Sequence, residues 1–337
     1  MEILIHKNRE DFLKRFDNQK TCGCAQTALN VWDEFLRHLN MKESEVIGFM
    51  TKSDDRYMVL SHMTQRWKRK LSRSSMDNYF IYIKQWLKYC GIKLDDDLIK
   101  EHIRLPKKLK ERPMPINRDV IKLLLENSNL VYKAFWLVLA STGMRPGKEL
   151  RGLKVSDVDF SSDPPKVTIR GELAKNGMAR ICFLTPEAST ALKKIIKDKK
   201  PNDLIFPFTY QAAWSAMNRV RRKLGLEQKT QNGKWNHLRI YKLRKFAETN
   251  LSNSVESEFA HAIIGHGKWQ MTYYETPDTE MGEMFKQAIP KLTISDEQRL
   301  QDENEKLRVD KTEYQLLKKQ NLEFATRLKR LEDLNKN

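Results

Sequence analysis

Five short segments between residues 141 and 275 are rich in side chains that can bind or attack a phosphate group. They are residues 141–153, 175–177, 238–247, 263–269 and 271–275. Their arginine, lysine, histidine and tyrosine residues are the types that a metal-free break in a phosphodiester requires. That reaction needs a side-chain nucleophile, cations directed at the non-bridging oxygens, and an acid for the leaving 5′ oxygen.

The overall charge points to a polyanionic partner. The 337 residues include 62 Lys and Arg against 44 Asp and Glu, which gives a formal net charge of +18. Such a surplus is typical of proteins that bind nucleic acid or an anionic membrane surface. No apolar run approaches the roughly 20 residues that span a bilayer, and the first residues do not resemble a signal peptide. We therefore expect a soluble, cytoplasmic or nucleoid-associated protein that binds nucleic acid and no membrane.

The four cysteines are Cys22, Cys24, Cys90 and Cys182. Cys22 and Cys24 are too close together for the usual zinc spacing, and no second Cys/His pair answers them. We therefore expect reduced thiols, no metal site and no cofactor.

Residues 141–153, Ser-Thr-Gly-Met-Arg-Pro-Gly-Lys-Glu-Leu-Arg-Gly-Leu, carry the first family resemblance. They are similar to the first conserved box of the tyrosine recombinases, or phage integrases, in which an arginine follows Thr-Gly-x at a turn between helices. The resemblance implies that Arg145 grips the phosphate, as a planar guanidinium does with two hydrogen bonds. The family usually has an acidic residue three positions after this arginine, whereas Glu149 is four positions after it.

The family's second feature is a lysine on a β-hairpin turn, which acts as general acid. Counting back from the expected second strand, residues 180–184, Lys175 takes that place. It directly precedes Asn176-Gly177, and this dipeptide between two apolar or alternating segments predicts a hairpin turn.

Residues 238–247 resemble the box in which His-x-x-Arg begins a helix. Arg244 matches the arginine, which implies a second phosphate clamp. Tyr241 stands where the family has histidine. Because a tyrosine hydroxyl donates a hydrogen bond but does not readily take a proton near pH 7, we expect Tyr241 to orient the phosphate. Lys242 and His237 stay open as substitutes for the histidine.

Ile264-Gly265-His266 is similar to the family's Leu-Gly-His box. The resemblance implies that His266 hydrogen-bonds a phosphate oxygen or shares proton handling with the nucleophile. Tyr274 is eight residues after His266, one fewer than is usual for the family's nucleophile, and Tyr273 is seven after it. The Met-Thr pair before them favours Tyr274, and Tyr273 stays open.

The elements that must position these residues fall into two domains. Apolar residues at helical spacing predict helices from Ala25 to about Leu39, from about Arg56 to Leu71, and from Ser74-Ser75 to Gly91. Asn117 is expected to cap a helix, and a buried helix follows it. The predicted divisions are a lead-in (1–20), a helical core-binding domain (21–103), a basic linker (104–113), a catalytic domain (114–290) and a C-terminal coiled coil (295–337).

The tail from residue 295 has a heptad pattern. Its members are Leu300, Leu307, Tyr314, Asn321 and Leu328, with Leu317, Phe324 and Leu331 three residues after the later ones. This spacing predicts a coiled coil, in which Asn321 could set register or oligomeric state. A lone amphipathic helix that folds back on the body is the alternative.

The predicted fold class is mainly α with a small β-hairpin or sheet, in the two-domain tyrosine recombinase architecture. The resemblance implies a site-specific recombinase that closes around double-stranded DNA and rejoins strands through a 3′-phosphotyrosine, without metal or ATP. It also implies a tetramer on paired sites. The heptads of the tail suggest a partner that binds through a coiled coil. Such basic integrases with an altered histidine position are similar to those of archaeal viruses and plasmids.

Two other interpretations stay open. One is a non-catalytic DNA-binding protein of the same fold. The other is a helical scaffold that dimerises through its tail, which does not explain why the five segments follow the family's order.

Overall fold

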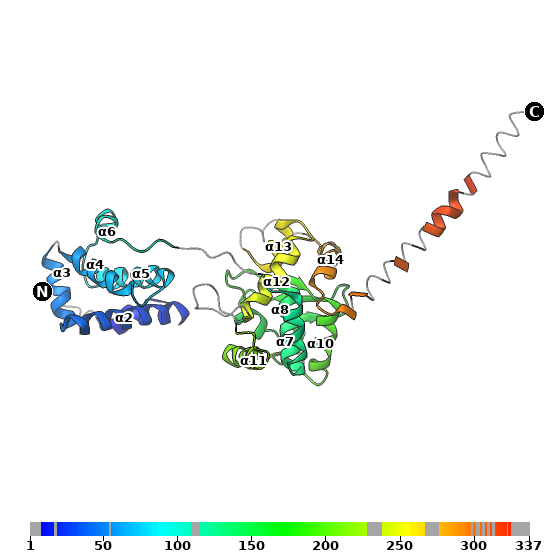
Figure 1. The fold of residues 1–337 in the computed structure, drawn as a ribbon, viewed down its shortest axis with the longest axis horizontal. Helices are drawn as coiled ribbons and strands as arrows, with labels where there is room; N and C mark the ends of the chain where they lie inside the picture. Colours follow the sequence, from blue (N-terminus) through cyan, green and yellow to red (C-terminus); the bar gives the residue numbers. More distant parts are fainter. Residues whose placement is uncertain are drawn as a thin grey trace, which may run out of the picture. The chain divides into compact units, whose positions relative to one another are not determined.

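The structure is a computed structural model that describes residues 8–16, 19–53, 55–108, 115–227, 238–266 and 276–297, with part of the segment 299–324. The chain divides into two compact units, residues 1–111 and 112–337. The division lies within the predicted basic linker, residues 104–113. Figure 1 draws the first unit from blue to cyan and the second from green through yellow to red.

The first unit is helical throughout the part that the structure describes. The three helices predicted from apolar periodicity are α2, α4 and α5, and short helices lie between and beside them. Ser72 caps α5 by accepting from the backbone N of Ser75 at 3.2 Å, so this helix begins slightly earlier than predicted. The helices are α1 (Arg9–Lys14), α2 (Gln19–Leu39), α3 (Glu43–Lys52), α4 (Arg56–Trp67), α5 (Arg73–Tyr89) and α6 (Asp96–His102).

The core of the first unit forms where α2 and α5 lie side by side (Figure 1). Trp32 of α2 and Trp86 of α5 are almost fully buried. Both indole N–H groups donate to Oε1 of Glu43, at 3.0 and 2.9 Å. Arg9 donates to the same carboxylate at 2.9 and 3.1 Å, and also to Asp33. One glutamate therefore satisfies two buried indoles and ties four helices together.

The predicted boundary of this unit at residue 21 lies too late in the chain. Phe12 of α1 is 2% exposed. Its ring lies 5.2 Å from that of Trp86 and 5.3 Å from that of Phe16, measured between centroids. A six-residue helix with one buried aromatic side chain is too short to show a periodic pattern, which is why periodicity assigns it to a lead-in.

Replacing Glu43 with alanine is expected to lower the free energy of unfolding of the first unit by about 2–4 kcal/mol. Two buried indole N–H groups and the Arg9 guanidinium lose an acceptor, at about 1–3 kcal/mol for each buried group left unsatisfied. Hydrogen exchange of the α2 and α5 amides across a urea series measures the change. Glu34→Ala is the matched control, because its surface ion pair with Lys70 contributes little. Equal effects of the two substitutions would contradict the role given to Glu43.

The second unit is built around α8, which Figure 1 draws among α7, α10 and α12. All side chains from Ala134 to Thr142 on α8 are buried, as predicted for this segment. Asn117 caps α7 by accepting from the backbone N of Asp119 at 3.2 Å, also as predicted. The helices are α7 (Arg118–Glu126), α8 (Leu130–Thr142), α9 (Lys148–Arg151), η1 (Val155–Asp157, 3-10), α10 (Pro186–Ile196), α11 (Tyr210–Lys223), α12 (Ile240–Ser252), α13 (Ser257–Ile264), α14 (Asp278–Lys286) and α15 (Ile289–Leu292).

A three-stranded antiparallel sheet interrupts these helices, in the order β1-β2-β3. Its strands are β1 (Val158–Asp159), β2 (Lys166–Ile169) and β3 (Arg180–Phe183). The predicted pairing of the last two is correct, and a turn is present at Asn176-Gly177, where the backbone N of Gly177 donates to the carbonyl oxygen of Ala174 at 3.3 Å. Ile169 pairs with Arg180, so the connection runs over residues 170–179. Leu173 and Ala174 in that connection are buried, and their burial holds the loop against the body and ends the strands early.

The folded body continues a few residues beyond the predicted end at residue 290. The carboxylate of Glu187 on α10 accepts from the backbone N of Ile294 at 2.7 Å and of Ser295 at 3.0 Å. Beyond it, the described residues between 304 and 324 are helical and exposed. Leu307, Tyr314, Leu317 and Phe324 are exposed by more than half. The coiled coil stays a prediction, and Leu328 and Leu331 lie outside the described residues.

None of the described helices is both long and apolar enough to cross a bilayer.

Candidate active site

Two glycines with left-handed backbone end the helices α8 and α13 and lie close together. Gly143 follows α8 with φ 62°, and Gly265 follows α13 with φ 86°. A Cβ on Gly143 would lie 3.2 Å from Cγ1 of Ile264, the last residue of α13. Because this backbone region favours glycine, the Thr-Gly and Gly-His segments of the sequence each specify a helix end at this place.

These two helix ends hold both predicted phosphate-binding arginines. Arg244 on α12 donates from Nη1 to the carbonyl oxygens of Gly143 and Ile264, the latter at 3.2 Å. Arg145 donates from Nη2 to the carbonyl oxygen of Gly265 at 3.2 Å. Carbonyl groups at helix C-termini lack partners within the helix and carry partial negative charge. They therefore stabilise two guanidinium groups near one another, although the groups are distant in the sequence.

Glu149 is the buried carboxylate of this cluster, with a side chain that is 1% exposed. It accepts from the backbone N of Arg145 at 2.8 Å, from the Arg145 guanidinium, and from Nη2 of Arg180 at 2.6 Å. Burial by itself raises the pKa of Glu149, but the hydrogen bonds and charges of Arg180 and Arg145 outweigh it and hold the pKa below its ordinary value. The carboxylate is therefore charged at neutral pH.

The turn from Arg145 to Leu150 accommodates the extra residue between Arg145 and Glu149. The backbone N of Leu150 donates to the carbonyl oxygen of Arg145 at 3.1 Å, which closes a loop one residue wider than a helical turn. Glu149, four positions after Arg145, thus reaches the arginine that its family counterpart would support from three positions away.

Arg145 keeps donors available for a ligand. Its side chain is 23% exposed. Within the described part of the chain, its guanidinium donates to Glu149 and to Gly265, which leaves three of its five N–H groups. Arg244 is 3% exposed, and burial followed by the charge of Arg145 lowers its pKa. Three guanidinium groups against one carboxylate give the cluster an excess of positive charge, which is favourable for an anion.

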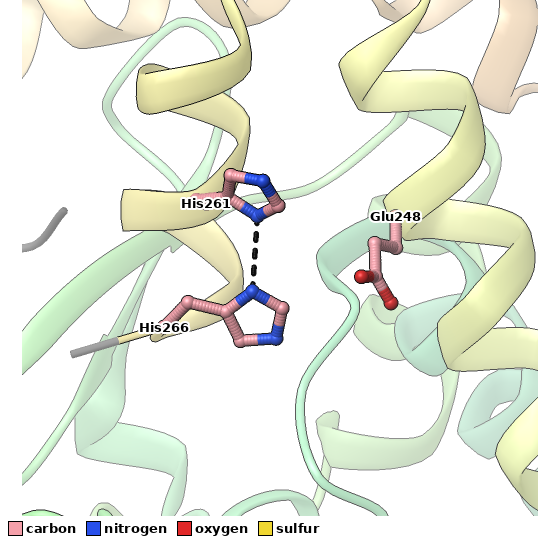
Figure 2. Close-up of side chains that lie close together, drawn as sticks. All are labelled: Glu248, His261 and His266. Atoms are coloured by element: carbon pink, nitrogen blue, oxygen red, sulfur yellow. Dashed lines mark hydrogen bonds between the residues drawn. The ribbon is translucent and has the colours of Figure 1, made fainter. Parts of the chain in front are cut away.

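His266 is placed by the Schellman turn that ends α13. Its backbone N donates to the carbonyl oxygen of His261 at 2.9 Å, and the N of Gly265 donates to Ala262 at 3.1 Å. The chain thereby folds back, and the two imidazole rings stack with centroids 4.9 Å apart and Nδ1 atoms 2.9 Å apart. Figure 2 shows the pair, with Glu248 of α12 facing it.

The charge state of His266 follows from these surroundings. Burial lowers its pKa, the carboxylate of Glu248 opposes this shift, and the charge of Arg244 adds to it. The net direction is downward, so the neutral imidazole prevails near pH 7 and can accept a proton.

Tyr241 lies on the first turn of α12 and is 45% exposed. It is three residues before Arg244, so both side chains lie on one face of the helix. Burial raises the pKa of Tyr210 at the start of α11, and the neighbouring Tyr241 adds to the shift. Lys242 is buried instead, and burial lowers its pKa. His237 lies outside the described residues.

The remaining predicted residues are not joined to this cluster by the structure. Lys175 is exposed in the connection between β2 and β3. Among the described residues, no hydrogen bond or ion pair links it to Arg145 or Arg244. Tyr273 and Tyr274 lie outside the residues that the structure describes. The cluster therefore contains Arg145, Arg244 and His266 of the predicted set.

Arg180 is the residue of the cluster that sequence reasoning missed. Its side chain is 5% exposed, and its Nε donates to the carbonyl oxygen of Ile263 at 3.1 Å. A signal was present in the sequence. Arg180 is a charged residue in a predicted apolar strand, and it lies on the same face of that strand as Cys182. Cys182 is a fully buried thiol whose pKa burial raises to about 11. All four cysteines are free.

The part of the chain that contains this cluster is similar to known proteins. Residues 115–279 match the model of the phage integrase family. A tyrosine recombinase, XerA of Saccharolobus solfataricus, is 26% identical over 200 residues, which cover 59% of this chain and 62% of that protein. The structure is similar to a lambda integrase dimer bound to a COC′ core site (TM-score 0.57, 15% identity, 78% of this chain and 93% of that one). It is also similar to XerH bound to difH (TM-score 0.54, 18% identity, 81% of each).

The fold is therefore that of the tyrosine recombinases, and the predicted fold class is confirmed. Residues 115–279, which contain every residue of the cluster, are the part of the chain that matches the phage integrase family model.

Replacing Glu149 with glutamine is expected to lower the free energy of unfolding by about 3–5 kcal/mol at neutral pH, the cost of breaking a buried ion pair. Because the folded-state pKa is depressed, the stabilising contribution is complete above the ordinary value of 4.5 and is lost as pH falls through the lower, folded-state pKa. Denaturation of both proteins as a function of pH measures this. The difference should shrink in acid; a difference that stays constant, or matches that of the exposed Glu172→Gln, would contradict it.

Gly265→Ala is expected to cost more stability than Gly177→Ala. Both glycines have left-handed backbone, where alanine costs about 1–2 kcal/mol. A Cβ on Gly265 would also lie 2.6 Å from Cζ of Arg180, whereas nothing lies within 4 Å of one on Gly177. The additional loss in the free energy of unfolding of Gly265→Ala, measured by urea denaturation, reports how tightly the Arg180 guanidinium packs against the Gly-His turn. Equal losses would mean that Arg180 moves away freely.

Proposed function

We propose that the chain is a site-specific DNA recombinase of the integrase type, which cuts and rejoins duplex DNA through a covalent 3′-phosphotyrosine. The observation that carries the proposal is the pair Arg145 and Arg244, held by two adjacent glycine turns beside His266. Two guanidinium groups so placed suit one phosphate with several charged oxygens. The match of this domain to the phage integrase family supports the same assignment.

In the proposed first step, the Oη of Tyr274 attacks the scissile phosphorus. A bond forms between Oη and phosphorus, and the bond from phosphorus to the 5′ oxygen breaks. Lys175 gives the leaving 5′ oxygen its proton. Arg145 and Arg244 stabilise the added charge of the pentavalent phosphate, and Glu149 keeps Arg145 oriented. A 5′ hydroxyl of another strand then attacks the phosphotyrosine and releases Tyr274. Because the ester bond is conserved, the cycle needs neither ATP nor a metal.

Tyr241 is assigned the task of orienting the phosphate from the first turn of α12. Its exposed hydroxyl can donate to an oxygen of an anion bound by Arg244 on the same helix face. Proton acceptance is assigned to His266, whose neutral form is favoured at pH 7.

The proposed partner is double-stranded DNA, bound by an assembly of four chains on paired sites. The +18 charge supports a polyanionic partner. A lambda integrase tetramer bound to a Holliday junction has a similar fold (TM-score 0.53, 14% identity), which supports the assembly. We assign the heptads of the tail to contacts between coiled-coil helices, with a second chain or another factor as partner.

A non-catalytic DNA-binding protein of the same fold is the second candidate. The observation that favours it is the replacement of the family's histidine by Tyr241. Such a protein would keep the arginine cluster for affinity alone.

Covalent trapping tests the proposal. Duplexes that bind the wild-type chain are first selected from a random pool, and each is then nicked at successive positions and incubated with protein in EDTA. On a denaturing gel, wild type should give a slow protein–DNA adduct that Tyr274→Phe does not form. Arg145→Ala and Arg244→Ala should reduce the rate of adduct formation about 10²- to 10³-fold, as expected for groups that stabilise developing charge.

The matched control is Arg222→Ala, which changes an exposed residue outside the cluster. It should form the adduct at the wild-type rate. Loss only in Tyr273→Phe would keep the enzyme and move its nucleophile by one residue. If selected duplexes bind but no protein forms an adduct, the non-catalytic candidate replaces the recombinase.

A further inference from the structure

We propose that Glu248, His261 and His266 form a binding site for a divalent transition-metal ion, with Zn²⁺ as the preferred ion. The proposal goes beyond the recombinase function, which uses His266 at a phosphate and gives no task to the other two residues. It rests on the convergence of three metal-binding side chains at the junction of α12 and α13.

The geometry brings one ligand atom from each residue within 4.8 Å of the other two. Glu248 comes from α12, His261 from α13, and His266 from the turn that follows α13 (Figure 2). All three residues are half-buried, so an ion between them would be partly shielded from water while the site stays open to solvent. The Schellman turn fixes His266 beside His261, and the packing of α12 against α13 brings up the carboxylate.

The donor set selects a class of ion. Two imidazole nitrogens and one carboxylate oxygen are typical of zinc sites that keep a fourth position for water or a ligand. Co²⁺ and Ni²⁺ accept the same donors. Mg²⁺ and Ca²⁺ require mainly oxygen ligands, which this cluster does not offer among the described residues. The site should therefore bind transition-metal ions in preference to Mg²⁺ and Ca²⁺.

Only small movements are needed to admit an ion. The Nδ1 atoms of the two histidines are 2.9 Å apart and share a hydrogen bond. Ligands at the usual zinc–nitrogen distance of about 2.0–2.1 Å in a tetrahedron are slightly further apart, so the rings must separate by a fraction of an ångström. Lys245 must also release Glu248, with which it forms an ion pair at 2.6 Å. The side chains of Lys245 and Glu248 are 60% and 16% exposed, and ion pairs three residues apart on a helix are weak.

An ion at this site would tie the two helices that carry Arg244 and His266. It would also occupy a ring nitrogen of His266. If the proposed function is correct, an ion on Nδ1 of His266 leaves the proton on Nε2, so the ring can no longer accept a proton and the ion inhibits or regulates strand cleavage. Binding of the ion itself does not depend on that function.

Titration of the full-length chain with Co²⁺ tests the site through visible d–d absorption. The wild-type chain should bind one equivalent with the spectrum of a four-coordinate nitrogen–oxygen site, and Zn²⁺ but not Mg²⁺ should displace it. His261→Ala and Glu248→Gln should each weaken binding at least about tenfold, as perturbed metal sites generally do. Circular dichroism without metal shows that each variant is folded.

Two controls separate this site from other ligands in the chain. His38→Ala removes a histidine that packs against His62 in the first unit, and it should leave Co²⁺ binding unchanged. Cys22→Ser with Cys24→Ser should also leave it unchanged, since these thiols lie on α2. Binding that is lost in the cysteine variant, that survives unchanged in His261→Ala, or that fails to appear in the wild type overturns the proposal. The trapping assay contains EDTA, so its outcome is independent of this one.

Discussion

The buried contact between Glu149 and Arg180 is the interaction on which the rest of the site depends. A charged pair out of water is stable only when hydrogen bonds satisfy it from several sides. Here the carboxylate binds Arg145 as well, and the Arg180 guanidinium binds the end of α13. The pair therefore joins α9, β3 and α13, which are far apart in the sequence. It also explains Gly265, since the guanidinium occupies the space that a side chain would need.

This arrangement prepares the cluster for an anion before one binds. Carbonyl groups at two helix ends and one carboxylate hold Arg145 and Arg244, so their positions do not depend on a ligand. Preorganised donors stabilise developing charge without a reorganisation cost at the moment of reaction. The excess of guanidinium groups over carboxylates keeps the site attractive to phosphate. The same contacts that stabilise the fold thus set the electrostatics of the site.

The sequence was most informative where a residue type has a single physical use. Asn117 before an apolar pattern and the buried run of α8 each follow from such rules. Periodicity failed for α1, whose only fully buried side chain is Phe12. Within the site, the order of motifs indicated Arg145, Arg244 and His266. The contact between Arg180 and Glu149 depends on tertiary packing, because these residues are 31 positions apart.

In the proposed mechanism, Tyr241 stands in the place of the family's histidine and orients the phosphate, so proton acceptance falls to the end of α13 instead of α12. Tyr241 is exposed. Glu149 is held as a carboxylate by two arginines and has no free oxygen facing a ligand, while Arg244 stays charged. Among the described residues of the cluster, the imidazole of His266 is then the group able to accept a proton in the physiological range. Its contact with His261 therefore matters more here than in a site with a second histidine on α12, because it sets which ring nitrogen of His266 is left to face the phosphate.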